Sequence, residues 1–463
     1  MKKQKKKPDG KTLKIRRHAY FLSSMLFVCV LTALSTVSLY IPERPSFSES
    51  EKRSLAEFPS FSFETLFSGD YFSGIDSWFS DTFPFRETLI SSSANVKKLL
   101  GMSSSIHNFS ESKADDIPDA APSDDDTNEE IKVDVPDTTQ DPLLAPALPV
   151  ADSTPPQQSQ GGEVLEQKFD AIYIYGNTAY EYYNFVQSTA DTYVSAVNSA
   201  AADAKANGIN LYSMIIPTST DITLNEETRS KLNSSDQKDA INYMYSQMSQ
   251  NVTTVPIYDL LKAHSNEYLY FRTDHHWTSL GAYYAYAKFM TVKGAEYTPL
   301  GNFTQYIFEP FLGSFYNDSG KSQALSKTPD AVYAYMPPVG NKFSMLQKNS
   351  SSYLDWPLIC DGSSYSESYK YLCFIGGDNP VSIIENTDMT EGETCVLVKE
   401  SFGNAFAPYL ICNYKYVYVI DYRYFDGDIT DFAKEKGATD ILVQNNISMT
   451  RNSSLVSRLS KTL

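Results

Sequence analysis

Histidine and cysteine are both scarce in this chain, with five residues of each among 463. None of the cysteines forms a Cys-x-x-Cys pair, which argues against a zinc site of the usual spacing. Cys29 stands alone near the N-terminus, and the others are Cys360, Cys373, Cys395 and Cys412. Outside a cell these four can form one or two disulfides, and packing as small apolar side chains accounts for them equally well.

Basic residues are also in deficit, since 39 Lys and Arg face 56 Asp and Glu and the net charge is −17. Residues 1–17 hold nine of the basic residues, so the rest of the chain is still more acidic. Binding to a phosphate backbone relies on clustered cations, so this composition argues against nucleic acid as the partner. A hydrophobic fraction of 42% with 13% aromatics predicts a substantial core.

A single uncharged apolar run, Tyr20–Ile41, follows the basic leader at residues 1–19. At a rise of about 1.5 Å per residue a helix of this length spans roughly 33 Å, enough to cross a bilayer. The positive-inside rule then places the leader in the cytoplasm and the chain from residue 42 outside. A cleaved signal peptide is the alternative, but the run is long and no Ala-x-Ala site follows. We therefore predict a single-pass anchor in the cell membrane.

Two stretches of different character come next. Residues 42–101 are rich in aromatics and are predicted to be the folded N-terminal part of the ectodomain. Residues 102–162 hold eight prolines, thirteen acidic residues and two lysines. Such a composition buries too little apolar surface to offset its ordering entropy. It predicts a disordered acidic, Pro-rich linker or surface insertion.

Residues 163–463 show the alternation of strands and helices that is typical of an α/β domain. Strands are predicted at 171–176, 210–217, 254–259, 394–399, 416–421 and 440–444, and helices at 189–206, 235–249, 405–412 and 429–436. Residues 295–370 are expected to be loops or small strands. The order strand, helix, strand implies parallel pairing with right-handed crossovers. Ligands of such sheets bind at the carboxyl ends of the strands, where Ser401, Asp421, Asn445 and Asn446 fall.

Two of the five histidines are adjacent, at His275 and His276, and they are the candidates for imidazole chemistry. Asp274 precedes them and Trp277 follows, a setting that can orient an imidazole, fix its tautomer and exclude water. The alternative is a turn with a capping Asp and packed aromatics. Thr278 and Ser279 are predicted to cap a helix that runs to about residue 290.

Ser401 is predicted at a tight turn from strand to helix, where its hydroxyl can project above the sheet. His276 is the candidate base that activates it, with Asp274 as the orienting carboxylate. Asn445 or Asn446 can donate to an oxyanion. The alternatives are a helix N-cap for Ser401 and an ordinary turn for the asparagines. The side chains of adjacent histidines usually point in different directions, so we expect no metal site at His275 and His276. We also expect no cofactor.

The segment Thr273-Asp-His-His-Trp-Thr with Gly281 resembles the signature of the bacterial DHHW proteins, which are related to SGNH-hydrolase-like proteins of alginate O-acetylation. The resemblance covers most of the chain outside the leader and residues 102–162. It includes Glu51-Lys-Arg-Ser-Leu-Ala, Gly376-Gly-Asp-Asn-Pro and Val398-Lys-Glu-Ser-Phe-Gly-Asn-Ala-Phe. It implies a three-layer α/β fold with an SGNH-hydrolase-like parallel sheet, circularly permuted because the serine follows the Asp-His pair.

The resemblance also implies a Ser-His-Asp triad of Ser401, His276 and Asp274. The implied activity is that of an O-acetyltransferase or acetylesterase on a cell-surface polysaccharide, supplied with acetyl groups by a multi-spanning membrane acyltransferase. The further candidates for substrate or oxyanion contact are His275, Trp277, Asn445 and Asn446. One departure is Glu400, where an Asp or a small residue is more usual. The alternative function is a non-catalytic envelope protein that binds glycan or organises a polysaccharide-modification assembly.

Overall fold

The computed structural model describes residues 165–169, 171–348 and 350–463, together with residues 114–119 and scattered positions between residues 25 and 83. The chain divides into two compact units, residues 1–104 and residues 105–463. The candidate site lies wholly in the second unit.

Few residues of the first unit are described. They include a short antiparallel pair, β1 (Phe47–Ser48) and β2 (Arg53–Ser54), and an edge-to-face contact between Phe58 and Trp78 with ring centroids 4.9 Å apart. No helix among the described residues is both long and apolar enough to cross a membrane. The predicted anchor lies outside the described residues except for Met25, and it therefore stays a prediction.

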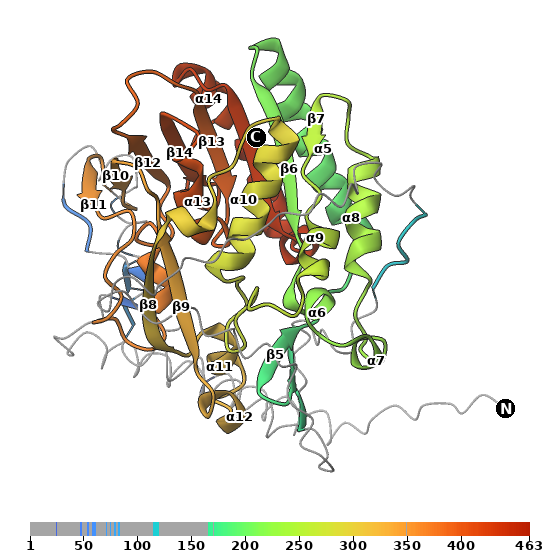
Figure 1. The fold of residues 1–463 in the computed structure, drawn as a ribbon. Helices are drawn as coiled ribbons and strands as arrows, with labels where there is room; N and C mark the ends of the chain where they lie inside the picture. The colour runs from blue at the N-terminus through green and yellow to red at the C-terminus, as the bar shows by residue number, and fades with distance from the viewer. Residues whose placement is uncertain are drawn as a thin grey trace. The chain divides into compact units, whose positions relative to one another are not determined.

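The second unit is a mixed α/β structure built on an eight-stranded sheet with the order β11-β10-β12-β14-β13-β15-β6-β7 (Figure 1). Its strands are β6 (Asn210–Ile216), β7 (Val252–Thr254), β10 (Asn341–Leu346), β11 (Tyr353–Trp356), β12 (Val381–Asn386), β13 (Thr394–Lys399), β14 (Tyr416–Asp421) and β15 (Asp440–Asn446). The run from β14 to β7 is parallel, as predicted. The edge formed by β12, β10 and β11 is antiparallel, so the predicted parallel sheet is confirmed only from β14 to β7 and the sheet as a whole is mixed.

The central strands are buried on both faces, which is why their middles are apolar, at residues 395–398 in β13 and 441–443 in β15. Cys395 and Leu397 pack on one face, with α9 (Tyr258–Ala263), α10 (Ser279–Lys293) and α13 (Gly403–Leu410). Val396 and Val398 pack on the other face. That face is covered by α5 (Gln187–Ala206), α8 (Gln237–Ser246), α14 (Ile429–Glu435) and α15 (Ser453–Thr462). The result is a three-layer arrangement with the sheet in the middle.

The other elements lie at the margins of this sandwich. A three-stranded antiparallel sheet is formed by β3 (Glu166–Lys168), β4 (Ile172–Tyr175) and β5 (Thr178–Glu181), and an antiparallel ribbon by β8 (Thr304–Phe311) and β9 (Asp330–Met336). The short helices are α6 (Ser219–Ile222), α7 (Glu226–Arg229), α11 (Ser314–Asp318), α12 (Gln323–Ser326), η2 (Leu300–Asn302), η3 (Lys370–Cys373) and η4 (Ile447–Arg451).

Two predicted elements differ from the structure. The strand predicted at 254–259 is wrong, because β7 ends at Thr254 and α9 begins at Tyr258. The stretch 295–370, predicted to be mainly irregular, contributes the β8–β9 ribbon and two strands of the main sheet. The strand predicted at 171–176 is present, but it belongs to the small sheet.

Part of the predicted linker, residues 114–119, is described and contacts the chain at the start of α5. The backbone N–H of Asp115 donates to the carbonyl of Phe185 at 3.0 Å, and the Asp115 carboxylate accepts from the N–H of Gln187 at 3.0 Å. Apart from residues 114–119, the segment 102–162 lies outside the described residues. The linker therefore stays a prediction.

Candidate active site

The histidine-bearing segment is a tight loop that leads into α10. An antiparallel bridge joins Tyr270 to Trp277 at its neck. Thr278 is the N-cap of α10, as predicted, and its hydroxyl accepts from the N–H of Gly281 at 3.4 Å. A side chain at Gly281 would place its Cβ 2.7 Å from the carbonyl oxygen of Leu269, so the close approach of the backbone requires glycine here.

A buried carboxylate from another part of the chain holds this loop. Asp330, at the start of β9, accepts from the N–H of Thr273 at 2.7 Å and from its hydroxyl at 2.6 Å. It also accepts from the N–H and Nε of Arg272, at 3.0 and 3.1 Å. Charge-assisted bonds of this kind are stronger than neutral ones, so Asp330 fixes the backbone directly before Asp274.

The structure brings together the three residues predicted to act on one another. Nε2 of His276 lies 2.7 Å from Oγ of Ser401, and Nδ1 of His276 lies 2.6 Å from Oδ1 of Asp274. Ser401 occupies the turn between β13 and α13, as predicted, and its side chain is partly exposed. These distances are those of direct hydrogen bonds.

Asp274 is buried and is held by three hydrogen bonds. Besides the imidazole of His276, it accepts from the His276 N–H at 3.0 Å and from the N–H of Ser314 at 2.7 Å. Burial alone would raise its pKa, but the imidazoles of His276 and His275 and the N–H of Ser314 hold that pKa well below its usual range. An ionised Asp274 accepts the Nδ1 proton of His276, which leaves the Nε2 lone pair facing Ser401.

Aromatic rings enclose this pair. The ring of Tyr371 stacks on that of His276 with centroids 4.0 Å apart and planes 13° apart, and its hydroxyl donates to the carbonyl of Ser401 at 3.0 Å. Nε1 of Trp277 donates to the carbonyl of Phe402 at 2.9 Å. Trp277 is completely buried, and this hydrogen bond fixes its ring to the Ser401 turn, while its contact with a substrate stays a prediction.

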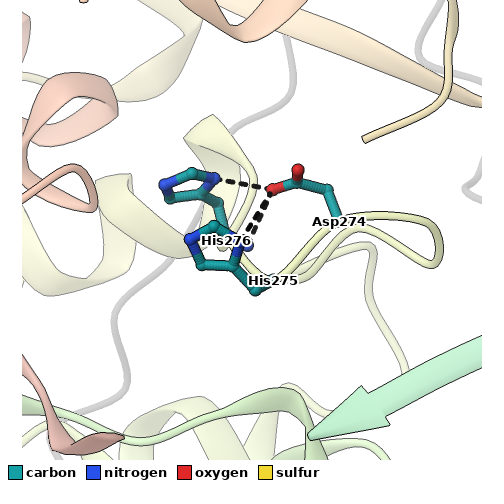
Figure 2. A group of neighbouring side chains, drawn as sticks. All are labelled: Asp274, His275 and His276. Atoms are coloured by element: carbon teal, nitrogen blue, oxygen red, sulfur yellow. Dashed lines mark hydrogen bonds and ion pairs between the residues drawn. The ribbon is translucent and has the colours of Figure 1, made fainter. Parts of the chain in front are cut away.

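His275 lies against His276, with ring centroids 3.9 Å apart (Figure 2). Its Nδ1 is 2.6 Å from Oγ of Ser314 and 3.9 Å from Oδ1 of Asp274. Desolvation and the neighbouring His276 lower its pKa. With 37% of its side chain exposed, against 9% for His276 and 7% for Asp274, it is the member of this cluster most open to a substrate.

The two predicted asparagines do not join this group. Oδ1 of Asn446 accepts from the N–H of Ser448 at 2.8 Å and its Nδ2 donates to the carbonyl of Ile216 at 3.3 Å, so its amide caps η4. Asn445 is two residues beyond Val443, which packs on the α5 face of the sheet. Within the described chain no hydrogen bond links either side chain to Ser401.

Asp274, His275 and His276 are also the group of described residues that could hold a metal ion, because one ligand atom from each lies within 4.8 Å of the others. Figure 2 shows both rings turned toward Asp274, so the expectation that the adjacent histidines diverge is wrong. Each Nδ1 already has a protein partner, in Asp274 or Ser314. Hydrogen bonds therefore account for the arrangement without a metal, and the absence of a metal site stays a prediction.

Sequence reasoning missed three contributors. Ser314 links His275 to Asp274, Tyr371 stacks on His276, and the carboxylate of Glu400 lies 3.3 Å from Oγ of Ser401. The first two come from the stretch 295–370 and its border, where no periodicity pointed to a site. Glu400 had a signal, since it departs from the residue that is usual before the serine.

Gly313 provides a test of how tightly Asp274 is held. A Cβ at this glycine would overlap the Asp274 carboxylate, and φ of −87° at this position shows that space, not backbone conformation, is the obstacle. We expect Gly313→Ala to displace Asp274 and to lower the kcat of a reaction at Ser401 by about tenfold or more, since small misplacements of reacting groups are costly. Gly320→Ala is the matched control, because nothing lies within 4 Å of its Cβ. It should cost some thermal stability through its φ of +66° and leave kcat unchanged. Equal kcat values for the two variants would contradict the prediction.

The fold and site define a three-layer α/β protein with a buried Asp–His pair that faces a serine at the carboxyl end of a central strand. The sequence profile of the DHHW protein family matches residues 51–140 and 157–420, so the chain belongs to the DHHW family. No curated protein matches it.

Solved structures agree on the fold. A DHHW family protein from Eubacterium siraeum DSM 15702 is 26% identical, with a TM-score of 0.58 over 65% of this chain and 98% of that one. Bacillus cereus PatB1 with a sulfonyl adduct is 16% identical, with a TM-score of 0.51 over 65% of this chain and 99% of that one. The O-acetyltransferase domain of Pseudomonas putida AlgJ is 13% identical, with a TM-score of 0.36 over 65% of this chain and 99% of that one.

Proposed function

We propose that this chain is a serine-dependent O-acetyltransferase or acetylesterase that acts outside the cytoplasm on a cell-surface polysaccharide. The observation that carries the proposal is the 2.7 Å contact between Nε2 of His276 and Oγ of Ser401, with Asp274 on the far side of the ring. A base must reach the proton that it removes, and here it does so directly. The family's relation to SGNH-hydrolase-like proteins of alginate O-acetylation supports acetyl as the group transferred.

In the proposed first step, Nε2 of His276 takes the proton of Ser401 as Oγ attacks the acetyl carbonyl. The new Oγ–C bond forms while the carbonyl electron pair moves to oxygen, and Asp274 stabilises the imidazolium. Collapse of the tetrahedral intermediate breaks the bond to the donor oxygen, which leaves with the proton from His276. The backbone N–H of Ser401 itself is the candidate donor to the oxyanion.

The second step repeats this chemistry in reverse. His276 removes a proton from a sugar hydroxyl or from water, and that oxygen attacks the acetyl group on Ser401. Expulsion of Oγ, which regains its proton from His276, regenerates the serine. Transfer and hydrolysis differ only in the acceptor, so the same residues serve both. No metal or cofactor enters either step.

The partners follow from where the protein would act. With the predicted anchor at residues 20–41, the second unit would face the cell-surface polysaccharide. The acetyl donor would then reach it through a multi-spanning membrane acyltransferase.

The test uses the purified full-length protein and 4-nitrophenyl acetate. We expect a burst of 4-nitrophenol and an acetyl group on Ser401 detected by mass spectrometry, because the acyl-enzyme forms before it is resolved. Ser401→Ala should show neither. A folded wild-type protein with no burst, no acetylated serine and no turnover would overturn the proposal in favour of a non-catalytic envelope protein. Acceptor oligosaccharides added to the acylated enzyme then separate transfer from hydrolysis.

A further inference from the structure

A second carboxylate, that of Glu400, lies at the nucleophile. Its Oε2 is 3.3 Å from Oγ of Ser401 and accepts from the N–H of Phe402 at 3.2 Å. Its Oε1 accepts from the N–H of Asn446 at 2.9 Å. The side chain is only 7% exposed, and among the described residues it has no ion-pair partner within 4.0 Å. A buried carboxylate is costly unless hydrogen bonds or charges compensate it, so its position next to Ser401 calls for an explanation.

The hydrogen bonds account for part of it. Both carboxylate oxygens accept backbone N–H groups, one from the Ser401 turn and one from the end of β15, so Glu400 ties the turn to the neighbouring strand. Burial raises the pKa of Glu400, while Arg423 and the two N–H groups oppose that shift. Two backbone N–H donors, one at each of its oxygens, suit the ionised form.

The hydroxyl of Ser401 stands between two acceptors, Nε2 of His276 at 2.7 Å and Oε2 of Glu400 at 3.3 Å. When the serine proton moves to His276, the ring becomes positive. Only Oγ of Ser401 then lies between this ring and the Glu400 carboxylate. Asp274 supplies negative charge on the Nδ1 side of the ring, and Glu400 supplies it on the Nε2 side. The two carboxylates therefore bracket the imidazole.

We propose that Glu400 is a positioning residue that holds the Ser401 turn against β15 and stabilises the imidazolium form of His276 while Ser401 reacts. This inference rests on the proposed serine chemistry and adds a residue to it. A purely structural Glu400 would affect stability and rate at every pH alike. A charge that stabilises the imidazolium must also move the acid limb of the pH–rate profile.

The sign of that shift follows from Coulomb's law. The negative charge of Glu400 near the His276 ring favours the protonated ring, which cannot act as a base. With the carboxylate present, the rate should therefore begin to fall at a higher pH on the acid side of the profile. Removing the charge should move the acid limb to lower pH, by about one unit for groups within about 6 Å. The other ionisable groups that face Glu400 or its partners belong to the loop before α10, to η3 and to the segment after β14: Asp274, His275, Tyr371, Tyr422 and Arg423.

The experiment compares full-length wild type, Glu400→Gln, Glu400→Asp and Glu435→Gln. Glu435 is on the surface of α14, so its variant controls for the loss of one charge elsewhere. The probe is phenylmethanesulfonyl fluoride, which forms an Oγ–S bond at Ser401 as fluoride leaves and the serine proton passes to His276. Labelling rates are measured from about pH 5 to pH 9 and the site is confirmed by mass spectrometry. Acetyl ester turnover is followed in parallel.

We expect Glu400→Gln to label about tenfold more slowly at pH 8 and to show an acid limb about one unit lower. Glu435→Gln should match wild type. If Glu400→Gln does not fold, Glu400→Asp carries the test, since it moves the charge away from Ser401 and should shift the limb in the same direction by less. An unmoved acid limb in the variants that fold overturns the inference. Labelling of Ser401 without acetyl turnover would instead count against the proposed substrate and leave this inference standing.

Discussion

Replacing His276 with alanine is expected to lower kcat for acetyl esters by about 10⁴-fold or more, because Ser401 loses the imidazole base that lies 2.7 Å from its Oγ. His275→Ala removes an imidazole of the same size whose Nδ1 contacts Ser314 instead. We expect His275→Ala to keep measurable activity. The measurement is kcat for both variants of the full-length protein, with melting temperature to confirm folding.

The pair of variants also tests which histidine acts. His276 contacts Asp274, and His275 contacts Ser314, which itself binds Asp274. A general loss of loop structure would therefore inactivate both variants. An active His276→Ala with an inactive His275→Ala would make His275 the base and would require the loop to rearrange. Full activity in both variants would contradict the proposed serine mechanism. A large loss confined to His276→Ala is the result that the 2.7 Å contact predicts.

The parallel core and the place of the site could be predicted because each depends on local pattern. Strands buried on both faces have apolar middles, and the short apolar runs of β13 and β15 are visible in the sequence. Parallel strands end at one edge, so Ser401 was expected there together with the other polar groups. The Asp-His-His-Trp segment supplied the base. These features need no knowledge of which distant segments meet.

The rest of the site depends on distant contacts that leave no local pattern. Ser314 reaches His275 and Asp274 across about forty residues, from a stretch that was expected to be loops or small strands. The antiparallel edge of the sheet was missed for the same reason, since β10 and β11 come from that stretch and β12 was not predicted as a strand. Long-range pairing decides both.

The asparagines show a different limit. Alternation along a strand says that Asn445 and Asn446 face opposite sides, but it does not say which side holds the site. In the structure Asn446 caps η4 and Asn445 continues the row of Val443 toward α5. Both residues lie at the carboxyl end of β15, as predicted, but neither side chain is hydrogen-bonded to Ser401 in the described chain.

Asp274→Asn is expected to cause the second large loss, about 10⁴-fold in kcat on the scale of the serine-protease template. Oδ1 of Asp274 accepts two N–H groups of His276, and Oδ2 accepts the N–H of Ser314. An asparagine has one acceptor and one donor group, so one of these sites must face a donor. If the amide nitrogen faces Nδ1, His276 carries its proton on Nε2 and cannot accept the proton of Ser401. If it faces Ser314, the buried N–H there loses its partner.

The same substitution should change stability with a recognisable pH dependence. Because the folded-state pKa of Asp274 is depressed, its carboxylate stabilises the fold above the unfolded pKa of about 3.9, and this contribution is lost as pH falls below that value. Asp274→Asn should therefore have a lower melting temperature than wild type at pH 7. The difference between the two melting temperatures should become smaller in acid, where the wild type also loses the carboxylate. Asp440→Asn is the matched control, since Asp440 is also buried and accepts from Lys293 and Tyr414 at the start of β15, away from Ser401. It should lose stability and keep its kcat per folded molecule. If Asp274→Asn behaves like Asp440→Asn, with lower stability and unchanged kcat, then Asp274 supports the loop and does not set the tautomer of His276.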